Sequence, residues 1–124
     1  MYTAQVLDHF QNPRNPGEVS DPDAMAEIEN PACGDVLRLT LRIEAGRIAE
    51  IRFKAKGCVA SIACASALTE LVRGRTVDEV RSQIGESLIR ENLIAALGGL
   101  PQASTHAAQL ALDALSTALS TLKS

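Results

Sequence analysis

The residues with the clearest chemical potential are a cysteine and an aspartate two positions apart, Cys33 and Asp35, with Gly34 between them. In an extended chain, side chains at positions i and i+2 point to the same side, about 7 Å apart at Cα. A thiolate and a carboxylate held in this way can approach one metal ion, and glycine places no side chain between them. Because this spacing is common by chance, its meaning depends on what the fold brings beside it.

Two later segments supply further ligand types. Cys58 is expected where a strand meets a helix, and a helix N-terminus favours a thiolate. The alternative for Cys58 is a small buried residue that only packs at this junction. His106 is expected in the first turn of the last helix, where the dipole favours a neutral imidazole that can bind metal. The alternative for His106, and with greater force for His9, is an ordinary surface or capping histidine.

A third cysteine, Cys64, is expected to point elsewhere. It follows Cys58 by six positions, about 240° around a continuous helix, so it is predicted to pack between helix and sheet. A role as an auxiliary thiol or sulfur acceptor stays open if the first helical turn is irregular. The remaining set suits tetrahedral zinc, or an iron–sulfur cluster with non-thiolate ligands. It comprises Cys33, Asp35, Cys58 and His106.

Two alternating stretches must position these residues. Apolar and polar residues alternate over 36–43 and 48–56, which is typical of strands with one buried and one solvent-facing side. Ala45-Gly46 between them predicts a hairpin turn. Antiparallel pairing then places Asp35, at the start of one strand, beside Cys58, at the end of the other. A further strand is expected over 24–29.

Helical periodicity accounts for most of the remaining chain. Gly74 provides a C-cap, and Thr76-Val77-Asp78-Glu79 forms a capping box that opens a short helix. The helix before Gly74 is expected to bury one apolar stripe that includes Ile62 and Val72. This helix is predicted over 59–73, and the other helices over 3–10, 87–97 and about 104–123. Without a linker or repeat, the chain is expected to form one α+β domain over 1–124.

The composition excludes several functions. The 124 residues carry a formal net charge of −3, and three of them are aromatic. No basic surface or stacking platform is expected, which argues against nucleic acid and anionic membranes as partners. No apolar run is long enough to span a membrane, and the N-terminus does not resemble a signal peptide. Three cysteines are unlike a secreted disulfide framework, so a cytoplasmic location is expected.

Four segments, in order, resemble one family. "YTAQVLDHFQNPRNPG" at 2–17 is similar to the opening of the IscU/NifU-type iron–sulfur cluster assembly scaffolds, and "NPACGDVLRLTLRI" at 30–43 resembles their first ligand motif. "FKAKGCVASIACASALTELVRGRT" at 53–76 resembles their second-cysteine segment and the helix after it. "GLPQASTHAAQLALDAL" at 99–115 is similar to their last ligand segment. The resemblance covers nearly the whole chain.

The resemblance implies a three-stranded antiparallel sheet with helices packed on one face and a long C-terminal helix. It also implies a scaffold that is not itself an enzyme. Such a scaffold binds iron, assembles a transient [2Fe–2S] cluster and passes it to acceptor proteins, with sulfur supplied as persulfide by a cysteine desulfurase. By position, Cys33, Asp35, Cys58 and His106 are the metal and cluster ligands. Zinc is expected at the same positions in the cluster-free form.

Three departures from the family pattern affect these expectations. The family's usual third cysteine directly follows the histidine, and here that position is Ala107. The family's Leu-Pro-Pro-Val-Lys chaperone-recognition sequence appears only as Leu-Pro-Gln-Ala-Ser at 100–104, which argues against docking to an Hsp70-type chaperone. Cys64 stands where the scaffolds usually carry serine. Two alternatives therefore remain: a zinc-bound sulfur-relay protein that accepts persulfide from a desulfurase, and a degenerate member that acts as a binding module.

Overall fold

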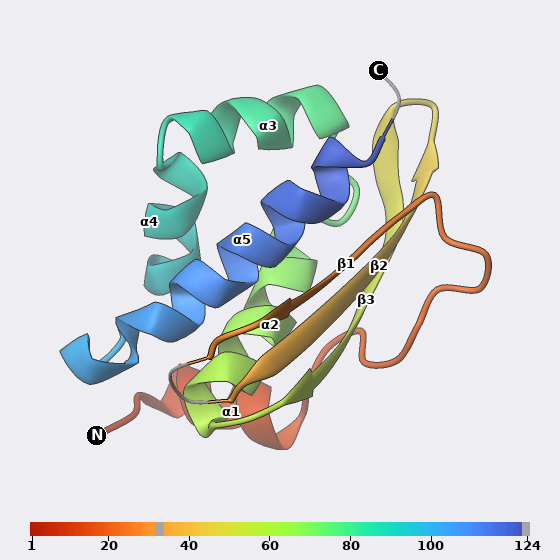
Figure 1. The fold of residues 1–124 in the computed structure, drawn as a ribbon. Coiled ribbons are helices and arrows are strands. Elements are labelled where there is room, and N and C mark those ends of the chain that lie inside the picture. Colours follow the sequence, from red (N-terminus) through yellow and green to blue (C-terminus); the bar gives the residue numbers. More distant parts are fainter. Residues whose placement is uncertain (32–33, 123–124) are drawn as a thin grey trace.

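Three antiparallel strands form one sheet in chain order, as the sequence predicts. The computed structural model describes residues 1–31 and 34–122. The strands are β1 (Ala24–Glu29), β2 (Val36–Glu44) and β3 (Arg47–Lys56), with β2 in the centre (Figure 1). Val36 at the start of β2 pairs with Lys56 at the end of β3. The segments that follow β3 and precede β2 therefore meet at one end of the sheet.

Alternation along β2 and β3 separates a buried face from a solvent-facing one. The buried apolar side chains of these strands are Leu37, Leu39, Leu41, Ile48, Ile51 and Phe53. The alternation in β3 changes phase because the register shifts beside Arg42: Ile43 pairs with Ile48, and Ala49 is the extra residue. Such a β-bulge turns Ile48 toward the core although it lies an odd number of positions from Ile51.

Five α-helices and one short 3-10 turn complete the described part of the chain. Thr3 and Thr76 cap the first and third helices by accepting hydrogen bonds from the backbone N–H of Val6 (3.0 Å) and Glu79 (3.1 Å). None of the described helices is both long and apolar enough to cross a bilayer. The elements are α1 (Ala4–Gln11), α2 (Val59–Val72), α3 (Val77–Gly85), α4 (Leu88–Ala96), η1 (Gln102–Ser104) and α5 (Thr105–Ser120).

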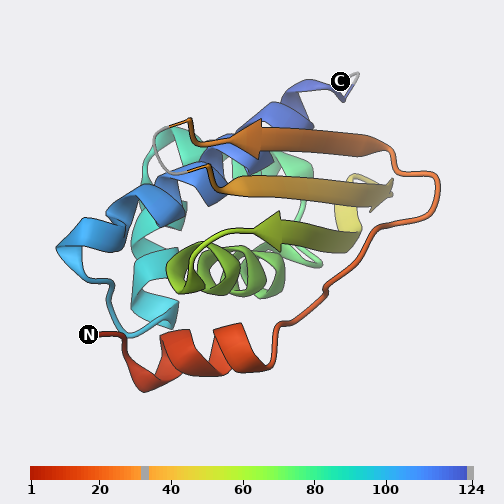
Figure 2. The same cartoon turned by 60° about the horizontal axis from the view of Figure 1, so that its bottom comes forward.

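The helices lie on one face of the sheet, as the resemblance implies (Figures 1 and 2). α5 packs along β1 and β2, and α2 packs on β3. Ten of the 14 residues of α2 are buried, because this helix also contacts α1, α4 and α5. The predicted stripe is buried at Val72 and half-buried at Ile62, but the expectation that burial is confined to this stripe is wrong, because small side chains are buried on the other sides of α2.

The segment between α1 and β1 follows the edge and the other face of the sheet (Figure 2). Asn15 and Gly17 exchange backbone hydrogen bonds with Phe53 of β3, at 3.1 and 2.8 Å. Val19 then donates its N–H to the Thr40 hydroxyl at 2.8 Å and is itself buried. These contacts cover part of an edge strand that would otherwise offer free backbone groups for pairing.

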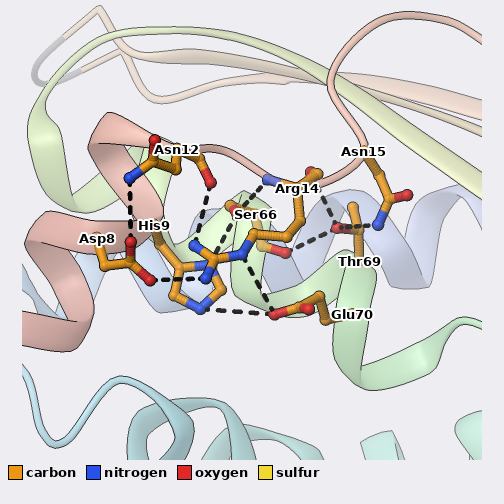
Figure 3. A network of polar contacts seen from close by, with 8 residues as sticks. All are labelled: Asp8, His9, Asn12, Arg14, Asn15, Ser66, Thr69 and Glu70. Carbon is orange, nitrogen blue, oxygen red and sulfur yellow. Dashed lines mark hydrogen bonds and ion pairs between the residues drawn. The ribbon is translucent and has the colours of Figure 1, made fainter.

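A polar network fastens α1 and the turn after it to α2 (Figure 3). His9 Nδ1 lies 2.8 Å from the Ser66 hydroxyl, which also accepts a 2.9 Å bond from the Arg14 backbone N–H. Arg14 pairs with Asp8 at 2.6 Å, and Glu70 lies 3.7 Å from His9 Nε2. We call this set the α1–α2 network; its members are Asp8, His9, Asn12, Arg14, Asn15, Ser66, Thr69 and Glu70.

His9 is buried, so the expectation of a surface or capping histidine is wrong for this residue. The partners of His9 come from α2, 57 and more positions away in the sequence, and no local pattern points to them. Burial lowers the pKa of His9, the Arg14 guanidinium lowers it further, and the carboxylates of Glu70 and Asp8 act in the opposite direction.

Candidate functional site

Three predicted ligand residues meet at one end of the sheet. One ligand atom each from Asp35, Cys58 and His106 lies within 4.8 Å of the other two, among the described residues. We call these three residues the ligand group. They come from the turn before β2, the start of α2 and the start of α5. Cys33, the fourth predicted ligand, lies outside the described residues.

Asp35 is held by the turn that connects β1 to β2. The backbone N–H of Gly34 donates to the Asn30 carbonyl at 2.7 Å, and the Asn30 N–H donates to the Asp35 carbonyl at 2.8 Å. Gly34 has φ +75°, a left-handed conformation that glycine adopts without strain. The Asp35 side chain is 4% exposed, so its carboxylate is fixed inside the protein and not in solvent.

Cys58 is the N-cap residue of α2 and remains partly exposed. Its Sγ donates to Asp35 Oδ2 at 3.3 Å, so the thiol and carboxylate are already in contact. The hairpin explains this contact, because it places the end of β3 beside the start of β2. A metal ion that replaced the thiol proton would find a sulfur and an oxygen ligand together, and a thiolate here would lie at a helix N-terminus.

His106 is the second residue of α5 and is exposed. Its Nδ1 lies 3.1 Å from the Ala103 carbonyl oxygen. A carbonyl only accepts, so this bond places the ring proton on Nδ1 and leaves the lone pair of Nε2 available. Metal-binding histidines commonly donate their other ring N–H to a backbone carbonyl in this way. The predicted position of His106 in the first turn of the last helix is confirmed.

Two further residues, Ser61 and Gly57, lie against the Asp35 carboxylate, and neither was predicted from the sequence. Ser61 donates its hydroxyl to Asp35 Oδ2 at 2.6 Å and lies 3.4 Å from Cys58 Sγ. Gly57 has φ +154°, and a Cβ atom there would lie 2.4 Å from Asp35 Oδ1. The available signal for Ser61 was its place three residues after the N-cap Cys58, where a first-turn side chain stacks over the cap.

Cys64 is not part of the ligand group. It is fully buried in the core, in agreement with the rotation expected along α2. Burial raises its pKa to about 12, and the nearby Cys58 contributes in the same direction. A thiol of this kind stays protonated and out of reach of solvent, which does not suit an auxiliary ligand or sulfur acceptor. Ala107, where the family usually has its third cysteine, is also buried.

The donor set of the ligand group fits a small, moderately soft cation. Zinc binds cysteine sulfur, histidine nitrogen and carboxylate oxygen at about 2.0–2.3 Å, which separates neighbouring ligand atoms by roughly 3.5 Å in a tetrahedral site. Cys58 Sγ and Asp35 Oδ2, 3.3 Å apart, are already at that spacing, and the widest separation in the ligand group, at most 4.8 Å, exceeds it by about 1 Å. Beside His106, a groove of about 240 Å³ runs between the end of β1 and α5.

The comparison with known proteins agrees with this fold. A family model described as NifU-like N terminal domain matches residues 1–124. Iron-sulfur cluster assembly scaffold protein IscU 1 of Archaeoglobus fulgidus is 40% identical over 96% of this chain and 74% of its own length. Iron-sulfur cluster assembly scaffold protein IscU of Azotobacter vinelandii is 38% identical over 95% of this chain and 91% of its own length.

A solved structure of the N-terminal part of a nitrogen-fixing NifU-like protein from Brucella abortus matches the fold. Its TM-score is 0.76, with 20% identity, and the match covers 97% of this chain and 92% of that one. The predicted α+β fold, with a three-stranded antiparallel sheet and a long C-terminal helix, is confirmed. The chain therefore belongs to the NifU-like N-terminal domain family, together with the IscU-type scaffolds.

Proposed function

We propose that this chain is a scaffold or carrier for iron–sulfur cluster assembly. One observation supports this role above the others: Asp35, Cys58 and His106 converge within 4.8 Å in a member of the NifU-like family. The two relatives named above are both described as iron-sulfur cluster assembly scaffold proteins. The cargo is iron and a transient [2Fe–2S] cluster, and the chain's contribution is binding and release, without catalysis of a reaction.

Each member of the ligand group has a defined part in this proposal. Cys58 supplies a thiolate, His106 supplies Nε2, and Asp35 supplies a carboxylate oxygen. Cys33 enters as the fourth ligand on the family motif alone. A carboxylate binds a cluster iron more weakly than a thiolate does, because iron–sulfur clusters prefer soft ligands. Asp35 thus keeps the cargo labile, which a protein that must release its product requires.

Zinc is proposed to occupy the same residues when no cluster is present. The mixed sulfur, nitrogen and oxygen donors suit zinc, and their proximity in this fold limits the rearrangement needed for binding. We further propose a cysteine desulfurase as the sulfur donor and iron–sulfur acceptor proteins as recipients, with a cytoplasmic location. Recognition by an Hsp70-type chaperone is not part of this proposal, because 100–104 lacks the family's second proline and its lysine.

Anaerobic reconstitution with ferrous iron, cysteine and a desulfurase tests the proposal. We expect the absorption spectrum of a [2Fe–2S] cluster, and we expect Cys58→Ala to lose it. Cys64→Ala is the matched control, since it removes a cysteine of the same helix outside the ligand group, and it should retain the spectrum. Iron and sulfide analysis then gives the cluster content per chain.

The same experiment separates the proposal from its rivals. A chain that acquires no chromophore but holds one zinc ion tightly would support the zinc-bound sulfur relay. In that case mass spectrometry after desulfurase treatment should find persulfide on Cys33 or Cys58, because Cys64 is buried and its pKa is about 12. A chain that holds neither metal nor cluster would contradict the scaffold and support a binding module.

A further inference from the structure

Ser61 contacts the ligand group from within α2. Its hydroxyl oxygen lies 2.6 Å from Asp35 Oδ2 and 3.4 Å from Cys58 Sγ, and the residue is 4% exposed. An ionised carboxylate only accepts hydrogen bonds, so the single hydroxyl proton of Ser61 is donated to Asp35. A hydrogen bond to a charged acceptor is roughly twice as strong as one between neutral groups.

The local fold explains why Ser61 reaches this carboxylate. Cys58 caps α2, and Ser61 is the third residue of the helix, so both side chains lie on the same side of its first turn. The hairpin brings Asp35 to that turn from the neighbouring strand.

The two oxygens of Asp35 are thereby held by different neighbours. Ser61 and the Cys58 thiol donate to Oδ2, and Oδ1 lies against Gly57, where a Cβ would approach within 2.4 Å. The carboxylate is therefore oriented before any metal binds. A metal that replaced the Cys58 proton would remove one of these donors, and the Ser61 hydrogen bond would remain.

We propose that Ser61 is a positioning residue that orients Asp35 for metal ligation. This inference rests on the metal site in the proposed function and adds a residue outside the predicted ligand set. Ligating carboxylates are commonly held by such hydrogen bonds, and loss of the partner typically weakens metal affinity by roughly 10- to 100-fold. Ser61 acts through Asp35 and is not itself a ligand.

Zinc competition against a chromogenic chelator tests this role. Ser61→Ala should bind zinc roughly 10- to 100-fold more weakly than the natural chain, and Ser61→Thr, which keeps the hydroxyl, should recover most of that affinity. Ser66→Ala is the matched control: it removes another buried serine hydroxyl of α2 that contacts His9 and Arg14 instead. It should leave zinc affinity unchanged within about twofold.

A double-mutant cycle separates positioning from a general structural effect. On an Asp35→Ala background, Ser61→Ala should weaken zinc binding by less than about twofold, because its target is gone. Cobalt substitution provides a spectroscopic readout: the d–d bands should shift in Ser61→Ala and stay unchanged in Ser66→Ala.

Two results would overturn the inference in different ways. If Asp35→Ala weakens zinc binding and Ser61→Ala matches the natural chain within twofold, the metal site stands and the role of Ser61 is wrong. If the natural chain binds no zinc, or if Asp35→Ala binds it equally well, both the inference and the proposed metal site fail. Melting temperatures of the metal-free variants verify that each one is folded.

Discussion

Two polar clusters lie along α2. They contain the same types of residue, but the side chains in each cluster make different contacts. At the helix N-terminus, the ligand group brings a carboxylate, a thiol and an imidazole together, and Ser61 contacts the carboxylate and the thiol. In the middle of the helix, the α1–α2 network combines His9, Ser66 and Glu70 with Arg14. Each cluster thus contains one histidine, one serine and at least one carboxylate.

The difference lies in the partners that face each histidine. His9 is buried between the Ser66 hydroxyl and the Glu70 carboxylate, and Arg14 supplies a cation to Asp8 and Glu70. In this network each charged group faces an opposite charge and each donor faces an acceptor, so the network holds α1 and the turn after it against α2. His106 is exposed, and one of its ring nitrogens lies within 4.8 Å of ligand atoms of Cys58 and Asp35. Residue type alone therefore does not distinguish a structural histidine from a metal ligand.

Thiol reactivity gives the largest expected contrast along α2. Cys64 lies between Ser61 and Ser66, and its pKa of about 12 against an ordinary 9.0 leaves about 1,000-fold less thiolate near neutral pH. In the native chain at pH 8, iodoacetamide should alkylate the partly exposed Cys58 and spare Cys64, as measured by peptide mass spectrometry. In urea both should react. If iodoacetamide alkylated the two cysteines at equal rates in the native chain, the burial of Cys64 in the middle of α2 would be contradicted.

Gly57→Ala should disrupt the ligand group and leave the α1–α2 network intact. The new Cβ would overlap the Asp35 carboxylate, and φ +154° is costly for alanine, by about 1–3 kcal/mol of unfolding free energy. We expect zinc affinity, measured by chelator competition, to fall roughly 100-fold.

Gly46→Ala is the matched control for Gly57→Ala. Its φ is +76°, but a Cβ there meets nothing within 4 Å, so it tests backbone strain without the overlap. It should lower stability and leave zinc affinity unchanged. A similar loss of zinc affinity in both variants would show that strain, and not the contact with Asp35, limits binding.

Ser66→Ala should have the opposite effect to Gly57→Ala: it should disrupt the α1–α2 network and leave the ligand group intact. It removes the partner of His9 Nδ1 and of the Arg14 backbone N–H, and leaving such groups without a partner costs about 1–3 kcal/mol. Urea unfolding of the metal-free protein should show this loss. If zinc affinity fell as far as in Ser61→Ala, the two clusters would be coupled and the contrast between them would be wrong.

The smallest of these expected effects is the contribution of His9 to the pH dependence of folding stability. Burial, followed by Arg14, lowers its pKa, so the unfolded chain binds more protons than the folded chain as the pH falls below about 6.5. Stability should therefore decrease from pH 7 to pH 5. His9→Gln should show a shallower decrease in urea unfolding with a chelator present. Parallel curves for the two proteins would contradict a buried, neutral His9.

The sequence predicted the strands and the meeting of Asp35 with Cys58 because these depend on local signals. Alternation over 36–43 and 48–56 specified the hairpin, and the hairpin alone brings those two residues together. The register shift that buries Ile48 has no comparable signal. The position of His106 in α5 was predictable from its capping context, but its approach to Cys58 depends on how α5 packs across β1 and β2.

Tertiary packing explains what the sequence did not predict. α2 is buried on nearly all sides because α1, α4, α5 and β3 surround it, and a helical stripe describes only one such contact. His9 and Ser66 are 57 positions apart, so no spacing rule connects them. Ser61 contacts Asp35 across the helix–strand junction, and that contact becomes visible only when both side chains are placed.

The stoichiometry and affinity of zinc binding in three matched pairs of variants test the central claim most directly. The pairs are Asp35→Ala with Asp78→Ala, Cys58→Ala with Cys64→Ala, and His106→Gln with His9→Gln. The account predicts one zinc per natural chain and a loss of at least about tenfold in affinity for the first member of each pair only. Equal affinities within the pairs, or losses as large in the second members, would contradict a metal site built from Asp35, Cys58 and His106.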